Sequence, residues 1–301
     1  MIDLHAHTDR SDGSSSPGEL LMLSRQAGLK ALAITDHDTL AGFDAALPLV
    51  ARCGVELVCG IELTTQFAGE GRRGTPMHVL GYFLKKIPGE EFRSWLAPIS
   101  TTRRDRNLRL MEKLQVSNID ISWEDFPRLG PEVAARPHFA RVLVEKGYVP
   151  DLQSAFDLHL CDLALEGIER KLPSPREAVG RIRRHEGIAS LAHPGRLQWP
   201  ISQLRSLIRE LVRDGLGAIE VYHSDHTLQE TFDLLQIAAE AGLLVTGGSD
   251  YHGENKPGVC LGSGRQGNVQ VPDEVLDNMK RRMSTEVPAM TIGKEPEDTF
   301  R

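Results

Sequence analysis

Short apolar runs that alternate with amphipathic stretches are the main pattern of this chain of 301 residues. The apolar runs have strand length and cover residues 2–4, 31–34, 55–61, 77–84, 188–192, 218–222 and 243–246. Apolar positions with helical spacing cover residues 18–26, 40–52, 175–185, 201–213, 228–241 and 272–283. Strands separated by helices indicate a parallel sheet that closes into a barrel, so the pattern predicts an α/β protein with seven strands.

Two parts of the chain depart from this alternation. Residues 68–75, between the third and fourth strands, are rich in turn formers and predict a hairpin instead of a helical crossover. Residues 89–165 contain helical patterns, at 103–114 and 139–146, with no convincing strand between them. We therefore expect a barrel built from residues 1–88 and 166–290, a helical insertion or cap formed by residues 89–165, and a polar tail at residues 291–301.

Side chains that bind metals follow the predicted strands. His5 and His7 are two positions apart, so on a strand they point to the same face. Residues at or just past the end of a predicted strand include His5, His7, His37, Glu62, His193, His223, Asp250 and His252. Barrels of this class gather their active sites at the carboxyl ends of the strands, so these residues predict a site for zinc, manganese or iron at one rim. His78 stands near the start of its strand, and the hairpin reversal would bring it to the same rim.

Composition and charge narrow the class of protein. A hydrophobic content of 40% and a charged content of 26% are typical of a globular protein. The net charge of −7 disfavours tight binding to duplex nucleic acid, which depends on many cations. No apolar stretch approaches the length of about 20 residues that spans a membrane, and no targeting segment is expected. The 4 cysteines form no CxxC pair, so we expect neither a disulfide framework nor a cysteine zinc site, and we expect a cytoplasmic location.

Five motifs, in order along the chain, resemble those of the polymerase and histidinol phosphatase (PHP) family, part of the amidohydrolase-like hydrolases. The motifs are Asp3-Leu4-His5-Ala6-His7, Thr35-Asp36-His37-Asp38, Gly60-Ile61-Glu62, Ala192-His193-Pro194 and Ser249-Asp250-Tyr251-His252. The resemblance spans nearly the whole chain. It implies a distorted (β/α)7 TIM-like barrel that holds two or three divalent metal ions.

The resemblance also implies a ligand set, carried over motif by motif. One metal would be bound by His5, His7, Glu62 and Asp250, a second by Asp12, His37 and His252, and a third by Glu62, His78 and His193. Glu62 would bridge two of the metals. Many members have histidine at the position of Asp12, and the harder carboxylate shifts the preference toward manganese or iron over zinc. We therefore expect manganese.

The insertion narrows the resemblance further. The segment Ala135-Arg136-Pro137-His138-Phe139-Ala140-Arg141 resembles the cap of the 3′,5′-nucleoside bisphosphate phosphatase subgroup, whose relatives include an exonuclease for short RNA. Such a cap closes over the metals and contributes groups that bind phosphate. The candidates for binding a second phosphate are therefore Arg136 and His138 in this segment, together with Arg196 after the predicted strand 188–192. His223 and His226 follow the sixth strand, and either is a candidate general acid. The arginines at positions 103, 104, 106 and 109 are expected on a solvated helix face.

These features predict a metal-dependent phosphoesterase in which Asp250 belongs to the catalytic machinery. Two cations about 3.5 to 4 Å apart activate a shared water, so a hydroxide that bridges the metals would attack phosphorus. The expected reaction removes the 3′-phosphate from a nucleoside 3′,5′-bisphosphate. The alternatives are a phosphatase for another small phosphomonoester such as histidinol phosphate, a 5′-3′ exonuclease on short RNA, and a noncatalytic module stabilised by metal. The expected partner is a small phosphorylated substrate, and no obligate protein partner is expected.

Overall fold

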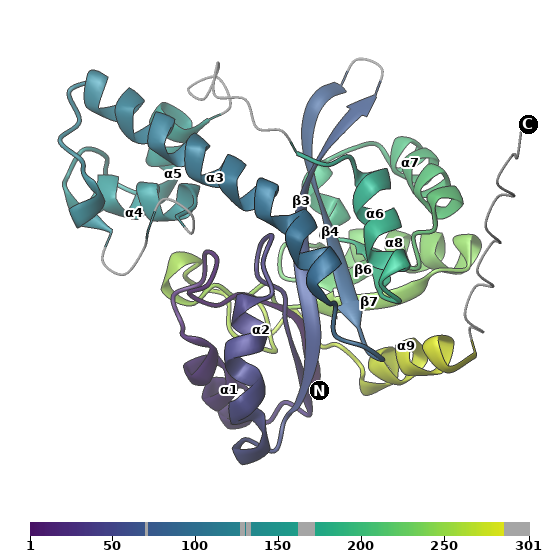
Figure 1. Ribbon diagram of the computed structural model, residues 1–301. Helices are drawn as coiled ribbons and strands as arrows, with labels where there is room; N and C mark the ends of the chain where they lie inside the picture. The colour runs from purple at the N-terminus through teal and green to yellow at the C-terminus, as the bar shows by residue number, and fades with distance from the viewer. Residues whose placement is uncertain (70–71, 127–129, 131–133, 162–171, 286–301) are drawn as a thin grey trace, which may run out of the picture.

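The computed structural model of the chain is organised around one seven-stranded sheet (Figure 1). It describes residues 1–69, 72–126, 130, 134–161 and 172–285, so the tail expected at 291–301 lies outside the described residues. The strands follow one another in chain order as β1 (Ile2–Ala6), β2 (Ala31–Ile34), β3 (Glu56–Gly69), β4 (Arg72–Phe83), β5 (Ile188–Leu191), β6 (Ala218–His223) and β7 (Leu244–Gly248). Each predicted strand is therefore present, because each apolar run is buried within the sheet.

The antiparallel hairpin of β3 and β4 interrupts an otherwise parallel sheet. β4 is antiparallel to both β3 and β5, whereas the other neighbouring strands are parallel. The predicted hairpin is confirmed, but it is longer than expected, because the two strands pair as far as Gly69 and Arg72 within the segment predicted as a turn. In the hairpin register, Thr64 lies opposite His78. The reversal thus brings His78 beside Glu62.

The sheet closes into a distorted barrel where β7 meets β1. The Asp250 N–H donates to the His5 carbonyl at 2.8 Å, and the His7 N–H donates to the Tyr251 carbonyl at 2.9 Å. Gly248, at the end of β7, has no side chain at the point of closest approach, where a Cβ atom would lie 2.3 Å from the His5 nitrogen. The closure places the two ligand-bearing segments that are farthest apart in sequence next to each other.

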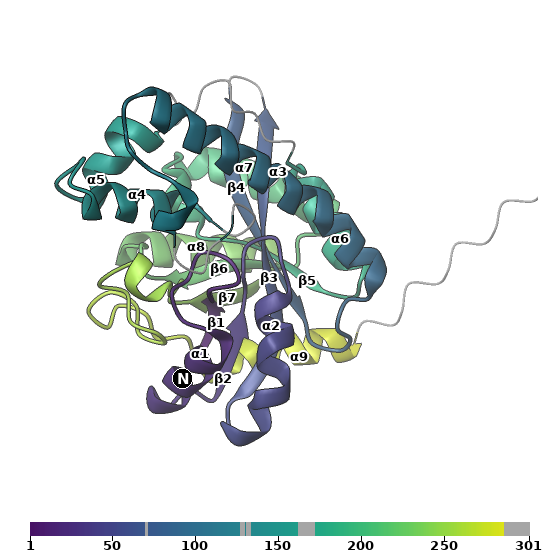
Figure 2. The same cartoon turned by 60° about the vertical axis from the view of Figure 1, so that its left-hand side comes forward.

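Helices surround this barrel. They are α1 (Pro17–Gln26), α2 (Ala41–Ala46), α6 (Pro175–Arg184), α7 (Ile201–Asp214), α8 (Leu228–Ala241) and α9 (Asp273–Thr285). Figures 1 and 2 show α9 at the lower end of the barrel, where Met279 packs in one cluster with Ile2 and Leu4. The single helix predicted over 40–52 is wrong, because α2 ends at Ala46 and a 3-10 helix, η1 (Leu47–Arg52), follows. Pro48 explains the break, since proline supplies no N–H for a regular α-helical hydrogen bond.

A group of helices between β4 and α6 crosses the upper end of the barrel (Figure 2). It contains α3 (Glu90–Val116), η2 (Trp123–Asp125), α4 (Arg136–Glu145), α5 (Leu152–Ala155) and η3 (Phe156–Leu160). These helices share a hydrophobic cluster of their own, which includes Leu110, Phe126 and Phe139. The division of the chain into barrel and cap stays a prediction. Among the described helices, none has both the length and the apolar content needed to cross a membrane.

Candidate metal centre

The nine residues predicted as metal ligands lie together at the carboxyl end of the barrel. They are His5, His7, Asp12, His37, Glu62, His78, His193, Asp250 and His252. His5 and Glu62 lie within β1 and β3, and His78 lies within the reversed strand β4. The others come from the loops that follow β1, β2, β5 and β7. The rim expected from the strand ends therefore exists, although Glu62 is not at a strand end because β3 extends beyond it.

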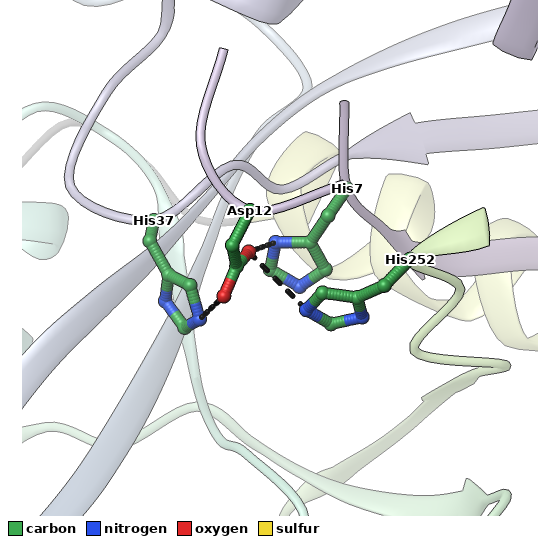
Figure 3. Close-up of side chains that lie close together, drawn as sticks. All are labelled: His7, Asp12, His37 and His252. Carbon is green, nitrogen blue, oxygen red and sulfur yellow. Dashed lines mark ion pairs between the residues drawn. The ribbon is translucent and has the colours of Figure 1, made fainter. Parts of the chain in front are cut away.

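Two groups of four residues place their ligand atoms within 4.8 Å of one another. The first group is His5, His7, Glu62 and Asp250, and the second is His7, Asp12, His37 and His252. Figure 3 shows the second group, with the Asp12 carboxylate between three imidazole rings. Its oxygens lie 3.5 Å from His7 Nδ1, 3.4 Å from His37 Nε2 and 3.2 Å from His252 Nε2. The first group is the set that the family resemblance implies for one metal, and the second contains the set implied for another, with His7 added.

Glu62 connects these groups to a third one. Its Oε2 atom lies 3.3 Å from His5 Nε2 and 3.1 Å from His7 Nε2. Its Oε1 atom lies 2.8 Å from His78 Nδ1 and 2.9 Å from His193 Nε2. The two oxygens of one carboxylate thus face different sets of imidazoles, which is the arrangement that a bridging ligand requires.

Imidazole nitrogens without a hydrogen-bond partner show whether the centre suits a metal. His5 Nε2, His7 Nε2 and His37 Nδ1 are buried and make no hydrogen bond within the described part of the chain. A buried polar atom without a partner is costly, so native proteins rarely keep one unless another group satisfies it. Because these nitrogens stand beside acidic oxygens, the donor set fits a divalent cation with nitrogen and oxygen ligands.

The protonation of the centre follows from burial and from neighbouring charges. Burial lowers the pKa of His37 and of His193 to about 3, so both rings are neutral at physiological pH, as metal ligands must be. Burial also lowers the pKa of His7, but the carboxylates of Asp250 and Glu62, 3.3 and 3.1 Å from its Nε2 atom, outweigh burial and raise that pKa to about 10. A cation between these carboxylates would replace the proton of His7.

Buried carboxylates outside the ligand set hold the ligand-bearing loops in place. Asp3 accepts hydrogen bonds from Ser249 N and Oγ, next to Asp250, at 2.9 and 2.6 Å. Asp36 accepts from Thr8 N at 2.8 Å and from Ser11 Oγ at 2.6 Å, and so shapes the loop before Asp12. Both belong to motifs that were recognised in the sequence without a role for these positions.

Glu220 supports two histidines of the centre at once, and the sequence analysis missed it. Its Oε1 atom accepts from His5 Nδ1 at 2.8 Å, and its Oε2 atom accepts from the backbone N–H of His193 at 2.6 Å. The first bond leaves His5 Nε2 as the nitrogen that faces the cluster. His193 has a φ of 27°, an uncommon value for a residue with a side chain, and the second bond holds it there. An acidic residue between the apolar Ile219 and Val221 of strand β6 was the available signal.

His223 and His226, the candidate general acids, have different surroundings. His223 Nδ1 accepts from the Asp225 N–H at 3.0 Å, so the proton of the neutral ring is on Nε2, 3.3 Å from Asp250 Oδ2. Burial lowers the pKa of His223 to about 4. His226 donates from Nδ1 to the Val221 carbonyl at 2.9 Å and accepts at Nε2 from the Gly195 N–H at 3.2 Å. Both ring nitrogens of His226 are therefore bonded to the backbone.

The candidates for phosphate binding are divided between two places. Arg196 Nη2 lies 2.9 Å from Asp250 Oδ2, directly beside the ligand cluster. His138, on α4, is buried, and its Nε2 atom lies 2.9 Å from Asn255 Nδ2, which in turn donates to the Asp12 carbonyl. Arg136 lies on the same helix, with its Nη1 atom 3.5 Å from the Leu160 carbonyl. The structure thus brings Arg196 to the metal centre directly and His138 through Asn255.

Arg103 joins α3 to the barrel rim. It is buried, and its Nη2 atom donates to Asp38 Oδ2 at 2.7 Å, one residue from His37. Asp38 also accepts from Thr64 N at 2.7 Å and from Thr64 Oγ1 at 2.8 Å. Arg106 is buried as well. The interpretation of these two arginines as part of a solvated face is therefore wrong. Both side chains are buried, and Arg103 contacts Asp38 in the loop after β2.

Comparisons with known proteins agree with this geometry. The PHP domain matches residues 3–171. A phosphoribosyl 1,2-cyclic phosphate 1,2-diphosphodiesterase from Eggerthella lenta is 33% identical, with 84% of this chain and 94% of that protein covered. A 3′,5′-nucleoside bisphosphate phosphatase from Chromobacterium violaceum is 30% identical, with 87% and 90% covered. A 5′-3′ exoribonuclease Rnm from Salmonella typhimurium is also 30% identical, with 84% and 85% covered.

A solved structure has the same architecture. It is an amidohydrolase from Chromobacterium violaceum with bound sulfate and no metal, and it superposes with a TM-score of 0.80 at 28% identity, with 93% of this chain and 96% of that chain covered. The match over 3–171, the identity to relatives of nearly full length, and the convergence of histidines and carboxylates at the barrel rim agree with one another. The chain therefore belongs to the PHP domain family and is a metal-dependent phosphoesterase.

Proposed function

We propose that this protein removes the 3′-phosphate from nucleoside 3′,5′-bisphosphates, with two or three divalent metal ions at the barrel rim. The observation that carries the proposal is that Asp250 lies between the ligand cluster and a guanidinium group. Its Oδ1 atom is 3.4 Å from His5 Nε2, and its Oδ2 atom is 2.9 Å from Arg196 Nη2. A substrate phosphate at the metals would leave a second phosphate within reach of a cation. The Chromobacterium violaceum relative named as a 3′,5′-nucleoside bisphosphate phosphatase supports this choice.

The roles of the residues follow from their positions. Bound divalent ions would supply Lewis acidity, which activates water and neutralises charge on the phosphate. We assign the nine predicted ligands to these ions, with Glu62 shared between them because its two oxygens face different imidazoles. His223 is preferred to His226 as proton donor to the leaving oxygen, because its Nε2–H faces Asp250 whereas both nitrogens of His226 bond to the backbone.

Manganese is the proposed metal. Asp12 supplies a carboxylate at the position where three imidazoles meet, and carboxylate ligands suit manganese or iron better than an all-histidine set would. Zinc remains the alternative that a competition experiment must test. The expected order of activation is manganese first, then iron, then zinc.

Cleavage of a phosphodiester is the second candidate. The relatives named as an exoribonuclease and as a cyclic phosphate diphosphodiesterase are as similar to this chain as the bisphosphate phosphatase is. The same metal ligands serve both reactions, because a metal-activated water attacks phosphorus in each. The cap helices and the cations at the rim then decide which phosphate is presented to the metals.

Hydrolysis of a panel of substrates tests the proposal, measured as phosphate release for the monoesters and as nucleotide release for the RNA. Manganese-loaded protein would be assayed with adenosine 3′,5′-bisphosphate, adenosine 5′-monophosphate, histidinol phosphate and a short RNA. We expect the highest kcat/KM for the bisphosphate, and we expect Asp250→Asn to abolish turnover. A preference for the RNA would favour the diesterase, and a preference for histidinol phosphate would refute the two-phosphate interpretation. Identical rates for the wild type and Asp250→Asn would refute the assignment of the site.

A further inference from the structure

Three cationic side chains meet at one carboxylate beside the metal centre. Arg196 donates from Nε and Nη2 to Asp225 Oδ2 at 2.9 and 2.6 Å, and Lys256 Nζ lies 3.3 Å from the same oxygen. Arg265 Nε donates to Asp225 Oδ1 at 3.0 Å. We call Arg196, Lys256 and Arg265 the Asp225 cation cluster. Of the three, the sequence suggested only Arg196.

Asp250 separates this cluster from the metal ligands. Its Oδ1 atom faces His5 Nε2 and His7 Nε2 at 3.4 and 3.3 Å. Its Oδ2 atom accepts from Arg196 Nη2 at 2.9 Å and from Lys256 Nζ at 2.7 Å. The two sites are therefore one carboxyl group apart.

The charges of the cluster do not balance. Three cations surround two carboxylates, Asp225 and Asp250, and Asp250 is the one that also faces the metal ligands. Once the charge of Asp250 is shared with a metal ion, two positive charges remain uncompensated at the rim. A single cation would be enough to neutralise Asp225, so a purely structural ion pair does not explain three.

The side chains of the cluster are partly exposed to solvent and partly buried. The Arg196 and Arg265 side chains are 38% and 43% exposed, whereas that of Lys256 is 15% exposed. They come from two loops, because Arg196 follows β5 while Lys256 and Arg265 follow β7. Asp225, after β6, holds the two loops together. Cations that are fixed before the ligand arrives lose little entropy on binding, and partial burial strengthens their charge-assisted hydrogen bonds.

We propose that the Asp225 cation cluster binds the non-scissile phosphate of the substrate, with Lys256 and Arg265 as residues of this subsite. The proposal rests on the proposed function, because it takes the metal centre as the place where the other phosphate is cleaved. Asp225 orients the side chains, and the guanidinium forks of Arg196 and Arg265 match the geometry of phosphate oxygens. The preferred substrates are then small molecules with two phosphoryl groups close together.

Arg265→Ala gives the sharpest test, because Arg265 contacts Asp225 but neither oxygen of Asp250. The experiment compares kcat/KM for adenosine 3′,5′-bisphosphate with kcat/KM for adenosine 3′-monophosphate, which lacks the second phosphate. Loss of a hydrogen bond to a charged group predicts that the ratio falls about tenfold or more, mainly through KM for the bisphosphate. Arg209→Ala, which removes an exposed arginine on α7, is the matched control and should leave the ratio unchanged.

Each outcome decides the proposal. A ratio equal to that of the wild type, or an equal loss for both substrates, overturns the subsite while the proposed function stands. If the wild type cleaves neither substrate, the proposed function fails, and calorimetric binding of adenosine 5′-monophosphate to the wild type and to Arg265→Ala then tests the cluster alone. Weaker binding to the variant supports the cluster, and equal binding overturns it. Melting temperature and manganese binding verify the fold, and Arg265→Gln replaces the alanine variant if that one does not fold.

Discussion

Replacement of Glu220 by glutamine tests how the barrel prepares its histidines for metal. The wild-type carboxylate accepts from His5 Nδ1 at 2.8 Å and from the His193 N–H at 2.6 Å. An amide has one acceptor oxygen, so in Glu220→Gln one of these donors faces an N–H₂ group and loses its partner. A buried donor without a partner costs about 1 to 3 kcal/mol. The metal-free protein can relieve this cost by letting His5 or His193 leave its position. Metal binding must then restore that position, so we expect about 10- to 100-fold weaker manganese binding.

The assay is calorimetric titration of metal-free protein with manganese, together with phosphate release at saturating manganese. Ser190→Ala is the matched control, because it removes a buried hydrogen bond of 2.8 Å to Thr246 in the same barrel without touching a predicted ligand. We expect the control to lose stability but to keep its manganese affinity. Glu220→Asp should bind manganese better than Glu220→Gln does, because it keeps the charge. The reasoning is refuted if Glu220→Gln binds manganese within about twofold of the wild type, or if Ser190→Ala shows an equal loss.

Three further predictions concern stability. Removal of metal by a chelator should lower the melting temperature, and manganese at 1,000 times its dissociation constant should restore about 4 kcal/mol of unfolding free energy; an unchanged melting curve would contradict the metal centre. Arg103→Ala should cost about 3 kcal/mol in urea unfolding, because it removes a buried cation that pairs with the buried Asp38 carboxylate, and Arg103→Met with Asp38→Asn should recover part of that loss. Burial lowers the pKa of His138 to about 4, so its contribution to stability is present above pH 6.5 and is lost as the pH falls. From pH 7 to pH 5 the wild type should therefore lose about 2 kcal/mol more than His138→Gln, and equal losses would refute this assignment.

Part of the fold and of the site can be read directly from the residues. A strand such as β2 is an unbroken apolar run between polar segments, and burial in a parallel sheet requires that composition. Most of the candidate ligands could be noticed because strand ends converge at one rim of a barrel, and the resemblance to the PHP family then supplied the set of nine. His78 could be included because the turn-rich segment before β4 indicated the reversal of that strand.

Other features depend on which segments meet in space. Pro98 does not end α3, which runs from Glu90 to Val116, because packing outweighs the local preference of proline. Arg103 looks like a surface residue until the helix is placed over Asp38. The composition of a helix does not say which of its faces the barrel will cover.

The sequence by itself determined the barrel class and the metal-binding chemistry, because these follow from residue types and from spacing along the chain, and the resemblance of its motifs to the PHP family supplied the candidate ligands. Only the tertiary structure decided what stands behind and beside those ligands. Glu220 supports His5 because the barrel brings β6 and β1 to a common interior, and Lys256 joins Arg196 at Asp225 because the loops after β5, β6 and β7 meet at one rim. Such partners are separated by tens or hundreds of positions in the chain, so closure of the sheet, rather than any local preference, makes them neighbours.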